Sequence, residues 1–342
     1  QYLIDAMKKS PYWKTGQLDR KIRFCLGAGY NGSVDREGRV HGYGEEAMQA
    51  CPDATRLGHA NYVGPKWETG DASTGVLDDH GIQATLLGFL AGPQESQIKM
   101  GQARDRLRET HHDYDLVAYE GGPSGYALPG SDSPEVRLAN ERYGKSLAMA
   151  VAVMDAWMRS YQYGWTHQNF LGYGQGTHWN SHTPLWDGFR PCPGWQALVL
   201  RNRFASGDLM RVEEKRVPTI SWDQQIQPLV GAYAMRDGDR WSVIVVSRKL
   251  DGRHDGHDFG DGCTPTTFHL PFQSAAKITL HRLTGDPRQS NRQGLRIEPQ
   301  SQEIPSEVLV DGTLSIDARS GGSAGGLPPG SILLYLFEET TP

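Results

Sequence analysis

The stretch that decides the fold is Leu116-Val117-Ala118-Tyr119-Glu120-Gly121-Gly122. An apolar run ends there on a single glutamate, and two glycines follow it. A short apolar run bounded by a turn signal is typical of a buried strand. Residues at the carboxyl ends of strands form the active sites of parallel barrels, so Glu120 is a candidate nucleophile. The alternative is an ordinary strand that ends in a solvated glutamate, and the heptapeptide alone leaves both interpretations open.

The chain around this stretch alternates between two kinds of pattern up to about residue 205. Strand-like apolar runs occupy 22–26, 54–62, 114–119 and 162–170. Helical patterns occupy 2–9, 45–50, 82–90, 94–110, 133–158 and 195–210. Strands that are apolar throughout and alternate with helices predict a parallel sheet covered by helices. We count four such units, whereas a closed barrel of this type needs eight strands.

The pattern changes at about residue 212. Short strand-like runs at 226–235, 241–246, 266–270, 276–283 and 331–337 are separated by turn-rich loops, without an intervening helical pattern. Such a succession is typical of a β-sandwich. The sequence therefore predicts a parallel sheet covered by helices over residues 1–211, followed by an all-β sandwich over residues 212–342.

Composition narrows the class of partner. The 342 residues carry a net charge of −5 without blocks of Lys or Arg, which argues against nucleic acid and anionic membranes. No apolar stretch approaches the roughly 20 residues that span a bilayer. The four cysteines lack C-x-x-C spacing, so we expect neither a zinc nor a redox site, and disulfides stay open. The polar stretch Asp251–Asp261 lacks the pattern of a calcium loop, which favours a hairpin connection over a bound cation. We expect no cofactor and no metal.

With these pieces in order, the chain resembles the retaining glycoside hydrolases of clan A, in particular α-L-arabinofuranosidases, β-xylosidases and β-glucuronidases. The resemblance rests on AYEGG (118–122), LGHANYVG (57–64), GWTHQNF (164–170) and the sandwich-like stretches WSVIVVSRK, LHRLTGDPRQSN and PPGSILLYLF. It implies a (β/α)8 barrel followed by a β-sandwich, with this chain providing about strands 5 to 8. AYEGG would then lie at the seventh strand, whose terminal Glu is the nucleophile in this clan.

The resemblance and the strand placement give a set of candidate site residues. Glu120 would be the catalytic nucleophile, and Tyr62 on the neighbouring strand would donate a hydrogen bond to it or simply pack there. Trp165 would be a sugar-stacking platform or a core residue, with His167 and Asn169 on the same face by strand alternation. The candidate substrate-binding residues are His59, Tyr62, Trp67, Tyr119, Trp165, His167, Asn169 and Trp179.

One catalytic group of this clan has no counterpart in the chain. The acid/base of the clan is a Glu after Asn at the end of the fourth strand, and the resemblance implies that this chain starts after that point. The Asn140-Glu141 pair lies downstream of Glu120, and Glu68 is a weak substitute. We interpret Gln1 as a processing site, a cut edge or the start of a fragment. An amino-terminal barrel half, in the same gene product or in another chain, would then supply the acid/base.

The sequence therefore predicts a retaining glycosidase that acts on a polysaccharide or oligosaccharide and is secreted or periplasmic. One rival is a non-catalytic carbohydrate-binding or assembly protein that kept the fold. Another is an inverting hydrolase, whose carboxyls stand roughly 6.5–9.5 Å apart instead of about 5–5.5 Å. The sequence leaves the sugar, its linkage and its ring form open.

Overall fold

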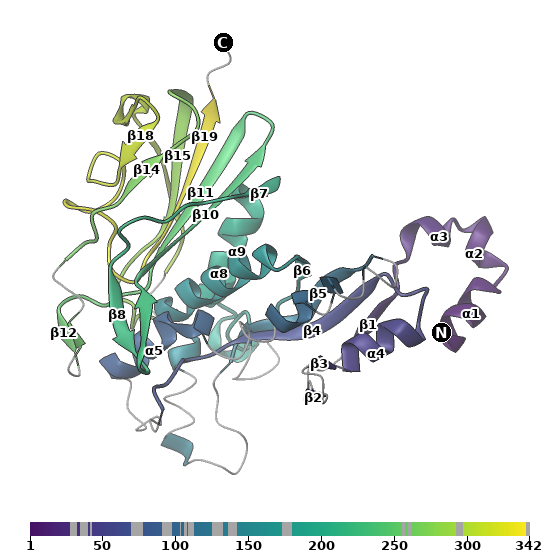
Figure 1. The fold of residues 1–342 in the computed structure, drawn as a ribbon. Coiled ribbons are helices and arrows are strands. Elements are labelled where there is room, and N and C mark those ends of the chain that lie inside the picture. The colour runs from purple at the N-terminus through teal and green to yellow at the C-terminus, as the bar shows by residue number, and fades with distance from the viewer. Residues whose placement is uncertain are drawn as a thin grey trace. The chain divides into compact units, whose positions relative to one another are not determined.

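The computed structural model describes residues 1–27, 33–34, 40–41, 43–69, 78–90, 98–102, 104–105, 108, 113–124, 133–135, 142–172, 180–254, 257–258, 262–291 and 297–339 (Figure 1). The chain divides into two compact units. Unit 1 contains Gln1–Tyr62, Gly92–Gly121 and Arg159–Phe170, and unit 2 contains Val63–Ala91, Gly122–Met158 and Leu171–Pro342. The division therefore does not follow the predicted boundary at 211/212, because part of the predicted half-barrel is grouped with the sandwich.

Unit 1 is built on a four-stranded sheet. Its strands are β1 (Cys25–Gly27), β4 (Arg56–Val63), β5 (Asp115–Pro123) and β6 (Trp165–Gln168), in the order β1-β4-β5-β6. The pairs β1–β4 and β5–β6 are parallel. Neighbours in sequence are thus neighbours in the sheet, as in consecutive strands of a (β/α)8 barrel. Four strands are half of the number that closes such a barrel.

Four helices and a small hairpin within the described ranges also belong to unit 1. They are α1 (Tyr2–Lys8), α2 (Tyr12–Thr15), α3 (Leu18–Lys21), α4 (Tyr43–Ala50) and the pair β2 (Ser33–Val34) and β3 (Val40–His41). The apolar core joins helix residues to one face of the sheet, and its buried members are Ile4, Met48, Cys51, Ala54, Leu57, Met100, Tyr114, Leu116, Ala118 and Trp165. Burial of this single face fixes which side of each strand points to the helices.

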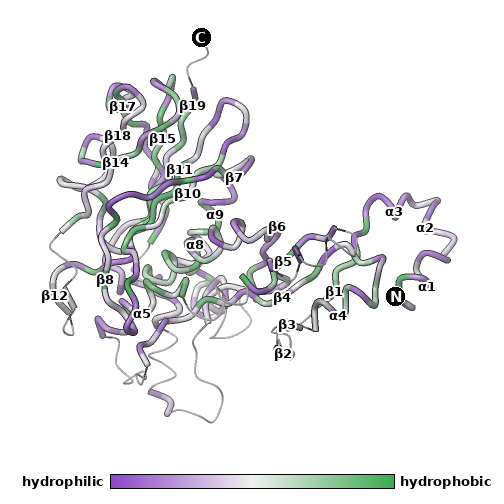
Figure 2. Tube along the Cα trace, viewed as in Figure 1, coloured by the Kyte–Doolittle hydropathy of each residue, from purple (hydrophilic) through white to green (hydrophobic). Residues whose placement is uncertain are grey.

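The sandwich in unit 2 consists of two antiparallel sheets. The larger one has the order β16-β15-β19-β11-β10-β7 and the smaller one β14-β18-β17. The bounds are β7 Asp208–Met210, β10 Val230–Asp237, β11 Arg240–Ser247, β14 Thr267–His269, β15 Ala275–Leu283, β16 Gln300–Ile304, β17 Leu309–Val310, β18 Thr313–Ser315 and β19 Ile332–Glu339. Apolar residues concentrate along the strands of the larger sheet (Figure 2), and its buried side chains share one core with Phe268, Leu309 and Leu314 of the smaller sheet.

Two hairpins and two 3-10 turns also belong to unit 2. They are β8 (Thr219–Trp222) with β9 (Gln225–Pro228), β12 (Arg253–His254) with β13 (His257–Asp258), η2 (Leu185–Asp187) and η3 (Ser306–Val308). The pair β12–β13 lies within the polar stretch for which we predicted a hairpin connection.

The predicted helix over 133–158 is interrupted: residues 134–135 and 142–144 are helical, but the helix breaks at Lys145 and Ser146. Helix α8 spans Leu147–Gln162, and Ser146 before it forms an antiparallel bridge with Ser290 of the sandwich. The Ser146 hydroxyl caps the helix by accepting the Met149 N–H at 3.2 Å. The N–H groups of Leu147 and Ala148 donate to carbonyls of the sandwich loop that follows β15. Because these partners are distant in sequence, local periodicity cannot locate the helix start.

Two other helices also differ from their predicted spans. Helix α5 spans Asp79–Leu86, capped by the Asp78 carboxylate that accepts the Gly81 N–H, and η1 (Gly88–Leu90) continues from it. Helix α9 spans Pro193–Phe204, and the predicted continuation to residue 210 is instead strand β7, paired with β10. The sandwich sheet thus begins before the predicted boundary at 211/212.

All four cysteines are free thiols. In the described part of the chain, no helix is long and apolar enough to cross a membrane.

Candidate functional site

The candidate site lies at the carboxyl ends of β4 and β5. The Ser124 N–H, just after β5, donates to the carbonyl of Val63, the last residue of β4, at 2.5 Å. The two strands therefore end side by side. Glu120 is half-buried within β5, three residues before its end, so the strand continues past the predicted end at this glutamate.

Tyr62 and Glu120 contact each other in unit 1. The Tyr62 hydroxyl forms a hydrogen bond with the Glu120 side chain. Burial raises the pKa of Tyr62 above its usual value, and the charge of Glu120 and this hydrogen bond raise it further. Tyr62 is therefore a neutral phenol at neutral pH, and its proton points to the carboxylate. The structure brings together the two residues for which the sequence predicts this contact, and their catalytic roles stay predictions.

Tyr119 lies on a floor of two glycines. A Cβ at Gly58 would come within 3.1 Å of the Tyr119 ring and of the Cys25 sulfur, and one at Gly27 would lie 4.0 Å from the ring. The absent side chains let the ring lie over β1 and β4, while 46% of Tyr119 stays exposed. An exposed ring fixed on a strand suits the apolar face of a sugar, so its predicted role in substrate binding stands as a proposal.

A second polar pair joins β4 to β6. Asn61 is 1% exposed, and its amide donates to Gln168 Oε1 at 2.6 Å. Neither residue is among those predicted from the sequence, although each is a polar residue within a strand-like run, one position from a predicted site residue. Buried amides of this kind are hydrogen-bonded as a rule, because an unpaired one is costly.

Trp165 is a core residue. It is 1% exposed and belongs to the apolar cluster that includes Leu116 and Ala118. No ring face is open to a ligand, so the structure favours core packing, the alternative to the predicted sugar platform. The half-buried His59 imidazole lies edge-on to the Trp165 ring, with the ring centroids 6.5 Å apart. The buried indole thus helps to orient this imidazole.

His167 and Asn169 do not share the environment of Trp165. Both are exposed. Leu116 pairs with Trp165 and Val117 with His167, so Thr166 is an extra residue in β6. This bulge breaks the alternation from which the sequence analysis placed the three residues on one face. His167 and Asn169 stay candidates for sugar hydroxyl contacts.

The remaining candidates follow the strands in loops. Trp67 is half-buried in unit 2, with its ring stacked on His80 at 6.2 Å and edge-on to Tyr143 at 5.8 Å. Glu68 accepts the backbone N–H of Asp223, also in unit 2. Trp179 and the Asn140-Glu141 pair lie outside the described residues. No group of three or more His, Cys, Asp or Glu side chains within the described ranges could hold a metal ion.

Comparison with known proteins gives a likeness at the level of structure. No protein-family profile and no curated protein sequence matches the chain. The fold is similar to the GH51 arabinofuranosidase from Xanthomonas axonopodis pv. citri, with a TM-score of 0.60 and 13% identity over 92% of this chain and 57% of that one. It is also similar to the α-L-arabinofuranosidase from Thermotoga maritima, with a TM-score of 0.58 and 15% identity over 96% and 60%. AbfB, a family 51 α-L-arabinofuranosidase from Bifidobacterium longum, matches with a TM-score of 0.58 and 14% identity over 95% of this chain and 60% of that one.

These structures extend well beyond the matched region, because the chain spans less than two thirds of the length of each. At 13–15% identity the likeness concerns the fold alone. The partial barrel followed by a β-sandwich, which the resemblance implied, is thus the fold that the chain shares with the clan A arabinofuranosidases of glycoside hydrolase family 51.

Proposed function

We propose that the chain is the carboxyl-terminal part of a retaining glycoside hydrolase, with Glu120 as its nucleophile. The observation that carries the proposal is the Tyr62–Glu120 hydrogen bond at the carboxyl ends of adjacent parallel strands. Active sites of (β/α)8 enzymes are built at this end of the strands. A fold shared with arabinofuranosidases supports a glycosidic substrate.

The proposed reaction is a double displacement. The Glu120 carboxylate attacks the anomeric carbon while the bond from that carbon to the leaving oxygen breaks, and an acid protonates that oxygen. Water then attacks the glycosyl ester and releases the sugar with retained configuration. The group that had protonated the leaving oxygen, a second carboxyl, takes the proton from this water. Tyr62 orients the Glu120 carboxylate by donating its phenolic proton in a hydrogen bond, without being consumed.

The acid/base would come from an amino-terminal barrel half, whether it belongs to the same gene product or to a separate chain. Glu68 fits that role poorly, because its carboxylate binds the turn of the β8–β9 hairpin. The carbohydrate substrate to test first is an α-L-arabinofuranoside, since the similar structures are arabinofuranosidases. We propose a secreted or periplasmic enzyme, in keeping with an extracellular polysaccharide as substrate.

Covalent trapping of the nucleophile tests this function. The full-length protein is incubated with 2,4-dinitrophenyl 2-deoxy-2-fluoro-α-L-arabinofuranoside, which loses dinitrophenolate as the glycosyl ester forms. Fluorine at C2 slows both steps by destabilising the cationic transition state, and the reactive leaving group restores the first one. We expect one adduct by intact mass and its location on the peptide that contains Glu120.

The same assay separates the rivals. An adduct on another carboxylate would overturn the assignment of Glu120. Turnover of the parent glycoside with an inverted product anomer, read by NMR, would instead identify an inverting hydrolase. Binding of arabino-oligosaccharides without adduct or turnover would favour the non-catalytic carbohydrate-binding protein.

Tyr62→Phe removes the hydrogen bond to the proposed nucleophile while keeping the ring. We expect kcat/KM for 4-nitrophenyl α-L-arabinofuranoside to fall by about 10- to 100-fold, the effect of one hydrogen bond to a charged group. Tyr12→Phe is the matched control, because Tyr12 is exposed on the helix α2 and kcat/KM should not change. Equal rates for wild type and Tyr62→Phe would show that the contact has no catalytic role.

A further inference from the structure

The β8–β9 hairpin of unit 2 ends in a tight turn. Asp223 and Gln224 join the two strands, and both have left-handed backbone conformations with φ of 49° and 59°. Positive φ at both central residues is the mark of a type I′ turn, whose twist matches the flanking strands. The turn therefore presents Asp223 on a rigid support.

Asp223 binds the loop that follows β4. Its carboxylate accepts the Lys66 ammonium at 2.9 Å on one oxygen and the Thr69 N–H at 2.8 Å on the other. In return, its own N–H donates to Glu68 Oε1 at 2.9 Å, and the Trp222 indole donates to the Lys66 carbonyl at 2.8 Å. Four hydrogen bonds thus connect the hairpin to residues 66–69, and this set of contacts is called the latch.

The electrostatics of the latch keep the Asp223 carboxylate ionised. The hydrogen bond from Lys66 and those from Thr69 lower the pKa of Asp223 to about 2. The pair is partly exposed, with 33% of the Lys66 and 18% of the Asp223 side chain accessible. Because the Asp223 carboxylate binds both a charged side chain and a backbone N–H of the loop, it fixes the position of the loop backbone as well as that of the Lys66 ammonium.

Aromatic stacking continues the latch into the barrel part of unit 2. The Trp222 ring stacks on His80 at 4.9 Å, His80 stacks on Trp67, and Trp67 meets Tyr143 edge-on. Tyr143 in turn donates to the carboxylate of Asp78, the residue that caps α5. Loop and helix are therefore held as one piece.

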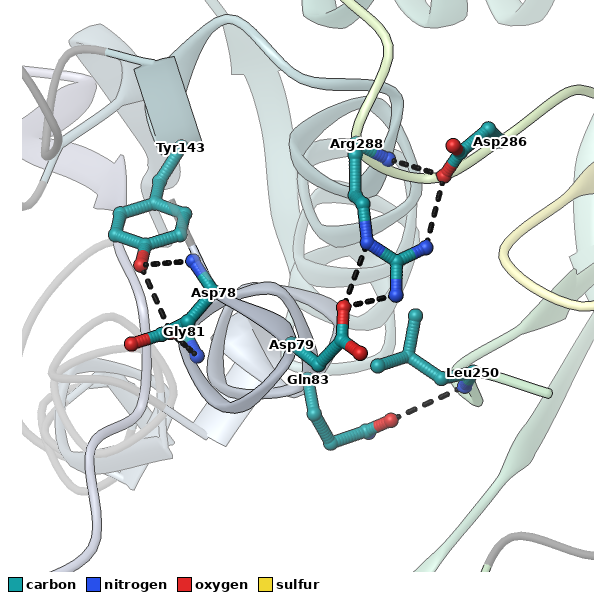
Figure 3. Close-up of polar contacts among 8 residues, drawn as sticks. All are labelled: Asp78, Asp79, Gly81, Gln83, Tyr143, Leu250, Asp286 and Arg288. Atoms are coloured by element: carbon teal, nitrogen blue, oxygen red, sulfur yellow. Dashed lines mark hydrogen bonds and ion pairs between the residues drawn. The ribbon is translucent and has the colours of Figure 1, made fainter. Parts of the chain in front are cut away.

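Figure 3 shows how the sandwich also holds α5 itself. Arg288, after β15, forms an ion pair with Asp79 in the first turn of the helix and is bound in turn by Asp286. Further along α5, the Gln83 side chain accepts the Leu250 N–H at 3.2 Å, which Figure 3 also shows. The same side chain donates to the Arg248 carbonyl at 2.7 Å. The loop and helix after β4 are thus fixed at both ends by sandwich residues.

We propose that Asp223 is a positioning residue of the glycosidase site, through which the sandwich hairpin fixes the substrate-binding loop 64–69. This inference rests on the proposed function. The loop begins directly after Val63, so it leaves the sheet at the carboxyl end of β4, the strand that carries Tyr62. Loops at this end bind substrate in (β/α)8 enzymes, and a loop that is ordered in advance loses less entropy on binding.

The test compares Asp223→Asn with wild type in the full-length protein, using 4-nitrophenyl α-L-arabinofuranoside. We expect KM to rise about tenfold with kcat changed less than about threefold, because the loop contributes binding to ground and transition state alike. Hydrogen exchange of the amides of residues 66–69 should accelerate in parallel. Asp223→Glu, which keeps the charge, should recover part of the loss in KM.

Two further variants make the test specific. Lys66→Gln removes the same ion pair from the loop side, and it serves as the test if Asp223→Asn does not fold. In the double variant, Lys66→Gln should raise KM little beyond the effect of Asp223→Asn alone. Asp237→Asn is the matched control, since this Asp ends strand β10 at another hairpin turn and bonds Ser206 rather than the loop. Its KM should equal that of wild type.

The outcomes distinguish this inference from the proposed function. If the wild-type protein gives no adduct with the fluorosugar and no turnover, both the proposed function and the positioning role are wrong. If the wild type is labelled at Glu120 but KM is unchanged in Asp223→Asn and Lys66→Gln, the proposed function stands and the positioning role of Asp223 is wrong. A lower unfolding midpoint without a change in KM would likewise reduce the latch to a purely structural contact.

Discussion

Glu120→Gln in the full-length protein is expected to lower kcat for 4-nitrophenyl α-L-arabinofuranoside by at least about 1000-fold. The amide is nearly isosteric with the carboxylate and can still accept the Tyr62 hydrogen bond, but it cannot form a glycosyl ester. Substrate binding should persist, so KM or the Kd for arabinose should change little. Initial rates and calorimetric titration measure the two quantities separately.

Chemical rescue identifies the role of the lost carboxylate. Glu120→Ala opens space on the face from which the nucleophile attacks, and azide can then take its place. Azide attack from that face breaks the bond to nitrophenolate and yields a glycosyl azide of inverted configuration. A product of retained configuration would instead identify Glu120 as the acid/base, because azide would then intercept an intact glycosyl-enzyme ester.

A matched substitution controls for charge alone. Glu213 is 69% exposed and forms an ion pair with Lys215, so Glu213→Gln removes one exposed carboxylate that lies outside the strands. Its kcat should equal that of wild type. A Glu120→Gln protein that is folded by circular dichroism and turns over at the wild-type rate would show that catalysis, if any, uses another residue.

The order of the strands could be predicted because each is an apolar run in its own right. Segments 54–62 and 114–119 lie almost entirely within β4 and β5. Their adjacency then follows from parallel β/α connection, and so does the approach of Tyr62 to Glu120. These inferences need only local hydrophobicity and chain topology, which one sequence contains.

Features that depend on distant partners could not be predicted. The bulge at Thr166 arises from pairing with β5, so alternation within 165–169 gives the wrong face for part of that segment. The start of α8 is set by hydrogen bonds to the loop after β15, and the Asn61–Gln168 pair forms across two strands. The latch is of the same kind, because nothing in residues 64–69 alone points to residue 223.

A buried ion pair in unit 2 is also invisible in the sequence. Asp155 of α8 and Arg248, just after β11, are 0% and 1% exposed and form a two-point ion pair at 2.5 and 2.9 Å. Arg248 also donates to the carbonyls of Pro228 and Val230, and Tyr233 donates to the Asp155 side chain. A Cβ at residue 231 would overlap the guanidinium, so Gly231 makes its room. Each of the three guanidinium nitrogens of Arg248 thus has a hydrogen-bond partner on the helix or the sheet.

Asp155→Leu is therefore expected to lower the free energy of unfolding by about 3–5 kcal/mol, because Arg248 would remain buried without its counter-ion. Arg248→Met alone should also destabilise, by leaving the carboxylate buried. Combining Asp155→Leu with Arg248→Met removes both charges and should recover a large part of the loss, since an apolar pair needs no desolvated partner. Urea unfolding followed by circular dichroism measures all three variants. Ala at both positions of the exposed Lys277–Glu303 pair, the control, should stay within about 1 kcal/mol of wild type. Losses that simply add in the double variant would mean that the two charges are not coupled, and that α8 is held to the sandwich by its apolar contacts instead.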